Sequence, residues 1–123
     1  MFDQLVEATG AKSVEWTNKL ECCGAPLTGM NDKLSADLTR GKINEALKAE
    51  ARFLCTSCPY CQIQFDTVQD MIAEKNQESQ QLPSVLFPQL LGLCLGIDSK
   101  RLGLKANKLD ITKIEHYLSK EQL

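Results

Sequence analysis

One stretch of the chain combines a predicted strand, a pair of cysteines and the start of a helix, and it reads Arg52-Phe53-Leu54-Cys55-Thr56-Ser57-Cys58-Pro59-Tyr60-Cys61. The apolar run 53–55 is short and lies between two segments with helical patterns, so it predicts a buried strand over 52–56. Pro59 is typical of the first turn of a helix. Cys58 is therefore predicted to lie where the strand ends and the next helix begins.

Helices and strands alternate on both sides of this stretch. The helix after Pro59 is predicted to bury one stripe made of Cys61, Phe65, Val68 and Ile72. Other helices are predicted over 2–9, ended by Gly10; over 34–51; over 88–95, ended by Gly96; and from Asp110 onward, with Ile111, Ile114 and Leu118. Further strands are predicted over 13–16 and 84–87, with a surface loop over 75–81. The alternation indicates an α/β fold with a small, mostly parallel sheet and flanking helices, and 123 residues correspond to a single domain, 1–123.

A second group of cysteines, Cys22-Cys23-Gly24, follows the predicted strand over 13–16. Because ligands collect at the carboxyl ends of strands in α/β sheets, the two groups are expected to converge. Neighbouring side chains on extended backbone point to opposite sides, so both sulfurs can face one site only if the backbone turns, and Gly24 permits such a turn. The four candidate ligands are Cys22, Cys23, Cys58 and Cys61. Four thiolates suit either an iron–sulfur cluster or a tetrahedral zinc ion, and their spacing does not choose between the two.

The remaining candidate residues have less support as metal ligands or catalytic groups. Cys55 is predicted to be a buried strand residue and Cys94 a packed helix residue, because cysteine is often buried as a small hydrophobe. Cys55, Cys58 and Cys61 imitate a ferredoxin run, but no fourth cysteine followed by proline completes it. His116 is predicted to be a solvated surface residue, while Trp16 is expected in the core and Tyr60 beside the ligands without a catalytic role.

Composition narrows the class of protein. A net charge of −2 argues against a nucleic-acid surface. The longest apolar stretch, 85–97, is broken by proline and glycine and is too short to span a membrane, and no signal peptide is predicted, so we expect a cytoplasmic location. In that compartment clustered cysteines favour a metal site over a disulfide framework.

The motif Cys22-Cys23-Gly24, 33 residues and then Cys58-Pro59-Tyr60-Cys61 resembles the carboxyl-terminal CCG domain in the B-type subunits of heterodisulfide reductase. Segments 5–11, 61–66 and 88–93 are also similar to those subunits, so the resemblance covers nearly the whole chain. It implies an oxidoreductase component with a non-cubane [4Fe-4S] cluster, four of whose five cysteine ligands would be the four named above. It also implies reduction of a thiol-derived disulfide such as CoM-S-S-CoB, with electrons from partner subunits that carry flavin or ordinary clusters.

The chain departs from the family pattern at its amino-terminal side. The first cysteine of the motif lies upstream of the pair in the family, farther than the 21 residues that precede Cys22 here. We therefore expect a partial domain that is inactive alone and that dimerises through an unpaired sheet edge. Two alternatives stay open: a CCG-domain component of another redox complex, of the lactate or glycolate oxidase or succinate dehydrogenase type, and a structural zinc module.

Overall fold

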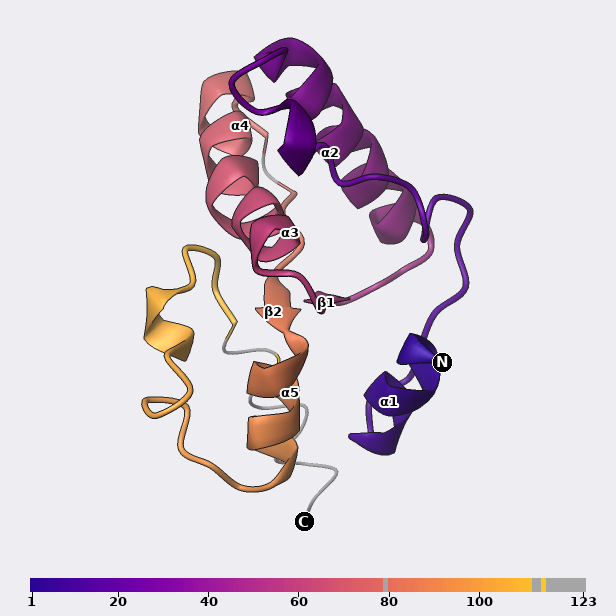
Figure 1. Cartoon of the computed structure of the whole chain (residues 1–123), viewed down its shortest axis with the longest axis vertical. Coiled ribbons are helices and arrows are strands. Elements are labelled where there is room, and N and C mark those ends of the chain that lie inside the picture. The colour runs from indigo at the N-terminus through magenta and orange to yellow at the C-terminus, as the bar shows by residue number, and fades with distance from the viewer. Residues whose placement is uncertain (79, 112–113, 115–123) are drawn as a thin grey trace.

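The fold is that of a computed structural model, which describes residues 1–78, 80–111 and 114 (Figure 1). The elements follow in the order α1 (Phe2–Ala8), a 3-10 turn (Ala25–Leu27), α2 (Asp32–Lys48), β1 (Leu54–Thr56), α3 (Pro59–Ile63), a π-helical turn (Gln64–Val68), α4 (Gln69–Asn76), β2 (Ser84–Leu86), α5 (Phe87–Cys94) and a second 3-10 turn (Leu104–Ala106). The predicted helices over 2–9, 34–51 and 88–95 and the strands over 52–56 and 84–87 are thereby confirmed.

The sheet consists of β1 and β2, which pair in parallel with Leu54 opposite Ser84 and Thr56 opposite Leu86. In Figure 1 the two strands lie at the centre, between α2, α3 and α4 on one side and α5 on the other. A parallel pair needs a crossover connection, which α3, the π turn and α4 provide here. The predicted α/β class with a small parallel sheet and flanking helices is confirmed.

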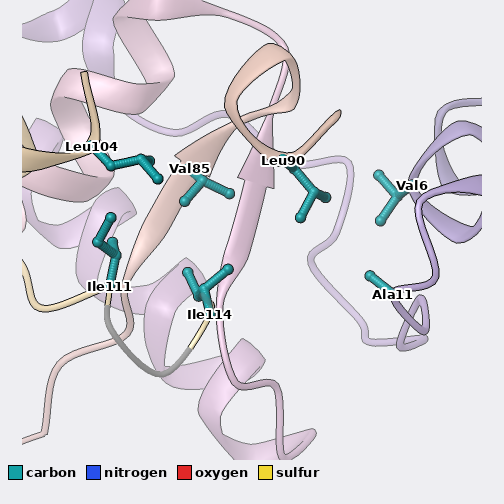
Figure 2. Packing of buried hydrophobic residues seen from close by; sticks show 7 residues of the cluster. All are labelled: Val6, Ala11, Val85, Leu90, Leu104, Ile111 and Ile114. Atoms are coloured by element: carbon teal, nitrogen blue, oxygen red, sulfur yellow. The ribbon is translucent and has the colours of Figure 1, made fainter. Parts of the chain in front are cut away.

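Two hydrophobic clusters occupy opposite faces of this sheet. Successive strand residues point to opposite faces, so Leu54 packs into one cluster while its neighbour Cys55 packs against the other. The cluster on the Cys55 side is shown in Figure 2 and contains Val6, Ala11, Val85, Leu90, Leu104, Ile111 and Ile114. The cluster on the Leu54 side contains Cys23, Ile43, Ala46, Leu54, Phe65 and Leu82, with Trp16 and Cys61 packed against it. Two of the predicted ligands therefore share one face of the sheet.

The helix after Pro59 differs from its predicted apolar stripe. Phe65 is buried as expected, but Val68 and Ile72 are only half-buried. The π-helical turn shifts the register in the middle of the segment, and Gln64, Asp66 and Gln69 face inward there, as does Gln62 in α3 just before it. Each forms hydrogen bonds, as buried polar groups must. The prediction of a single apolar stripe was wrong because it assumed one constant helical period.

The predicted strand over 13–16 is also wrong, since this segment has no regular secondary structure. Its polar groups bond to side chains instead: the Ser13 hydroxyl donates to the Asp3 carboxylate over 2.7 Å, and the Lys19 ammonium donates to the Val14 carbonyl over 3.0 Å. Lys19 also pairs with Asp3 at 2.9 Å. The segment is thus fixed to α1 rather than to the sheet. Leu118, His116 and most of the predicted last helix lie outside the described residues.

Candidate thiolate metal centre

Cys58 occupies the position predicted for it, between the end of β1 and the first turn of α3. Its side chain is exposed, and the backbone N–H groups of Cys61 and Tyr60, in the first turn of α3, face the sulfur closely enough to favour a negative charge on it. These donors stabilise the thiolate, so they lower the pKa of Cys58 below the ordinary cysteine value. Cys58 is therefore the candidate ligand best prepared to bind a metal without first losing a tightly held proton.

The Cys22-Cys23-Gly24 segment forms a loop rather than the end of a strand. Gly24 adopts φ +94°, the left-handed conformation that glycine tolerates without strain. Cys22 Sγ accepts the Gly24 N–H at 3.4 Å, and Cys23 Sγ accepts the Ala25 N–H at 3.5 Å. Cys22 is exposed while Cys23 is buried. The turn that was predicted for Gly24 is present, although the strand predicted before it is not.

Side chains from α2 fasten this loop through its carbonyl groups. The Thr39 hydroxyl donates to the Cys23 carbonyl and the Ser35 hydroxyl donates to the Gly24 carbonyl, each over 2.8 Å. From the π turn, the Gln64 amide donates to both hydroxyls, at 2.9 Å to Ser35 and 2.8 Å to Thr39. All three side chains are buried. The sequence gives no sign of this network, because Ser, Thr and Gln on amphipathic helices carry no signal that separates them from ordinary surface residues.

The two cysteine motifs meet at one point. Cys61 Sγ donates to Cys23 Sγ over 3.1 Å, although the residues are 38 positions apart in the chain. Burial is the main cause that raises the pKa of Cys61 to about 12, and the hydrogen bond to Cys23 adds to it. Thiols from the two motifs therefore converge, as predicted. Within the part of the chain that the structure describes, however, no three histidine, cysteine or carboxylate side chains lie close enough to hold a single metal ion.

The other two cysteines lie apart from this point. Cys55 packs against the cluster on the opposite face of the sheet, and burial raises the pKa of its thiol to about 12. Cys94 is half-buried at the carboxyl end of α5. Trp16 packs against the cluster that holds Cys23, as expected for a core residue, whereas Tyr60 is 73% exposed. Cys55 thus has the packing role that the sequence predicted.

These differences predict an order of thiol reactivity in the metal-free, reduced chain. Near neutral pH, Cys58 should react with iodoacetamide first, because it is exposed and its pKa is lowered, so its thiolate persists to lower pH than an ordinary cysteine's. Cys55 should react much more slowly, because it is half-buried and its thiol ionises only near pH 12. Peptide mass spectrometry of timed samples measures both rates. In denaturant the two rates should become similar, and equal rates in the folded chain would contradict the described burial.

Comparison with protein families places the site in a known context. The family model described as the CCG, cysteine-rich domain matches residues 1–66, more than half of the chain and all four candidate ligands. The chain belongs to this family. The resemblance to heterodisulfide reductase is also confirmed, since relatives named as its B-type subunits align with most of this CCG domain.

Three relatives illustrate the range of proteins to which this chain is similar. The B-type subunit of the ferredoxin:CoB-CoM heterodisulfide reductase of Methanosarcina mazei is 40% identical over 109 residues, which are 86% of this chain and 36% of the relative. The 8-methylmenaquinol:fumarate reductase membrane anchor subunit of Wolinella succinogenes is 37% identical over 92% of this chain and 40% of the relative. A protein of Archaeoglobus profundus, named as similar to the B-type heterodisulfide reductase subunits, is 30% identical over 81% of this chain and 34% of the relative.

The CCG domain described here spans well under half the length of these relatives. Their names are those of oxidoreductase components, which supports a redox role for the domain as part of a larger complex. One relative is a membrane anchor subunit. Within the described part of this chain, each helix is too short or too polar to cross a membrane.

Proposed function

We propose that this CCG domain holds an iron–sulfur cluster through Cys22, Cys23, Cys58 and Cys61 and serves a redox complex of the heterodisulfide reductase type. The observation that carries the proposal is the meeting of Cys23 and Cys61, whose sulfurs lie 3.1 Å apart although they belong to two separate motifs. Relatives named as heterodisulfide reductase components support a disulfide, such as that of coenzymes M and B, as the substrate class. The cluster would then be the non-cubane [4Fe-4S] type that the resemblance implies.

The donor set consists of thiolates, which are soft ligands that both iron–sulfur clusters and zinc accept. In a tetrahedral zinc site with Zn–S bonds of about 2.3 Å, all sulfurs lie about 3.8 Å from one another. Among the described residues no three donors come together closely enough to hold one ion. An iron–sulfur cluster distributes its thiolate ligands over two or more irons. The 3.1 Å between Cys23 Sγ and Cys61 Sγ is shorter than the separation in either kind of site, so these two sulfurs must move apart when metal binds. The choice of the cluster over a zinc ion therefore rests on the resemblance to the B-type heterodisulfide reductase subunits rather than on the spacing of the sulfurs.

Each ligand is prepared for binding in a different way. Backbone N–H groups hold Cys58 close to its thiolate form, while Cys61 must release its proton when metal binds. The buried carbonyl contacts of Thr39 and Ser35 hold the Cys22-Cys23 loop against α2. When bound, an iron–sulfur cluster supplies one-electron transfer at a potential that its surroundings set. The exposure of Cys22 and Cys58 leaves this side of the site open to a disulfide or a partner protein.

We further infer where the domain acts and how far it extends. Thiolate ligands persist in a reducing compartment, so we infer a cytoplasmic location. Packing of Ile111 and Ile114 against Val85 joins the last described residues to the sheet, which supports one domain as far as residue 114, and we infer that this domain covers 1–123 (Figure 2). A fifth ligand, partner subunits with flavin or ordinary clusters, and dimerisation of the isolated chain all stay predictions.

The test is metal analysis of the chain purified without oxygen and reconstituted with ferrous iron and sulfide. We expect iron and acid-labile sulfide in similar amounts, with visible charge-transfer absorption. Cys58→Ser should reduce the bound iron severalfold because one of four ligands is lost, whereas the matched control Cys94→Ala, away from the site, should retain it. Stoichiometric zinc without sulfide would support the structural zinc module instead, and equal iron in both variants would contradict the ligand assignment.

A second function is favoured by the similarity to the menaquinol:fumarate reductase anchor subunit, which covers 92% of this chain. In that case the same cluster would pass electrons between a quinone and a partner protein, without cleavage of a disulfide. Redox titration separates the two functions once the cluster is in place. Oxidation of the reduced cluster by an organic disulfide supports the first function, and oxidation by a soluble menaquinone analogue with no response to disulfides supports the second.

A further inference from the structure

Lys42 places an ammonium group beside the loop that carries Cys22 and Cys23. It extends from the middle of α2 and is half-buried. Its Nζ lies 5.8 Å from the centroid of the Trp16 ring and 5.9 Å from that of Phe65, and it donates to the carbonyl of Glu21, the residue before Cys22. Two aromatic rings and a carbonyl therefore fix the position of this charge. The amphipathic pattern of α2 gave no indication of the arrangement.

No carboxylate forms an ion pair with this ammonium group in the described part of the chain. The four ion pairs found there involve Lys19 twice, Arg40 and Lys48, and Lys42 takes part in none of them. Burial lowers the pKa of Lys42, and the groups that oppose this effect are, in order of strength, Cys23, Cys61, Cys22 and Glu21. Lys42 therefore lies within electrostatic range of three candidate ligands, Cys22, Cys23 and Cys61.

We propose that Lys42 is the counter-charge of the thiolate site, a positioning residue that offsets the negative charge of the cysteine ligands and raises the reduction potential of the cluster they hold. The inference rests on the proposed function for its effect on a cluster, but the field of the ammonium group at the cysteines exists without metal. A cation in a partly buried site acts strongly because little water screens it. Reduction adds negative charge to a cluster, so a fixed nearby cation favours the reduced state.

The matched variants are Lys42→Met, which keeps an apolar side chain of similar length over the two rings, and Lys42→Arg, which keeps the charge. A purely structural role would depend on packing and would leave the local potential unchanged. A counter-charge role requires that arginine preserve the effect and methionine abolish it. Circular dichroism should show that both variants remain folded.

The first readout needs no metal. In the reduced chain, the rate of reaction of Cys22 with anionic iodoacetate is divided by its rate with neutral iodoacetamide, so the fraction of thiolate cancels. Loss of a nearby positive charge should lower this ratio about threefold in Lys42→Met and leave it unchanged in Lys42→Arg. Cys94 serves as the internal reference. An equal ratio in all three proteins would overturn the inference, and this result does not depend on whether the chain binds iron.

The second readout is the midpoint potential of the reconstituted cluster. Lys42→Met should lower it by about 60 mV, which corresponds to a tenfold change in a one-electron equilibrium, while Lys42→Arg should stay close to the parent chain. Equal potentials in the methionine variant and the parent would overturn the effect on the cluster. If the parent chain takes up no iron–sulfur cluster, the proposed function fails, and the alkylation ratio alone decides whether Lys42 acts as the counter-charge.

Discussion

Gly24→Ala should lower the free energy of unfolding by about 3 kcal/mol, because the new methyl group has no space and the backbone conformation is unfavourable for alanine. A Cβ atom built on Gly24 would lie 2.5 Å from the backbone oxygen of Ser35, and φ at this position is +94°. The left-handed conformation costs alanine about 1–2 kcal/mol, and overpacking adds about 1–3 kcal/mol. Backbone cannot move aside as a flexible side chain would, so the loop must leave α2.

Gly29→Ala is the matched control. Gly29 also has a positive φ, +86°, but nothing lies within 4 Å of its Cβ position, so this variant should lose only the conformational part, about 1 kcal/mol. Urea denaturation of the parent and both variants measures the difference. In Gly24→Ala the site should also suffer, because the displaced loop carries Cys22 and Cys23. If both variants lost the same free energy of unfolding, contact with Ser35 would not be the reason that position 24 requires glycine.

The sequence predicted the parts of the fold that local signals control. The apolar run before Cys58 and the proline after it mark a strand end and a helix start, and both occur at the predicted residues. The alternation of strands and helices was enough for the parallel sheet, since a parallel pair requires a helical crossover. The two motifs meet as expected at Cys23 and Cys61, although the strand expected before Cys22 is absent and α2 holds that loop instead.

The errors arise where distant side chains decide the structure. Residues 13–16 alternate like a strand, but Lys19 and Asp3 supply bonding partners that no window of the sequence reveals. A π-helical turn adds a residue to one turn, so a constant period assigns the inward face incorrectly beyond Cys61. Lys42 looked like part of a solvated helix face, and only the fold places Trp16 and Phe65 around it. Tertiary contacts of this kind depend on the whole chain.

The buried network over the cysteine loop leads to the second large effect. Thr39→Val should lower the free energy of unfolding by about 3 kcal/mol, although the two side chains have nearly the same shape. The Thr39 hydroxyl is fully buried, donates to the Cys23 carbonyl and accepts the Gln64 amide, each over 2.8 Å. Valine leaves both groups without this partner, and each unsatisfied buried polar group costs about 1–3 kcal/mol.

Thr39→Ser separates the contribution of the hydroxyl group to stability from that of the methyl group. Serine keeps the hydrogen bonds to Cys23 and Gln64 and loses one buried methyl group, so its loss should be about 1 kcal/mol. Valine should therefore destabilise the chain more than serine, the reverse of the order expected if Thr39 acted by packing alone. The same order should appear in the amount of iron retained after reconstitution, because Cys23 is held through its own carbonyl. A valine variant as stable as the serine variant would mean that the carbonyl of Cys23 finds another donor and that the position of the loop does not depend on Thr39.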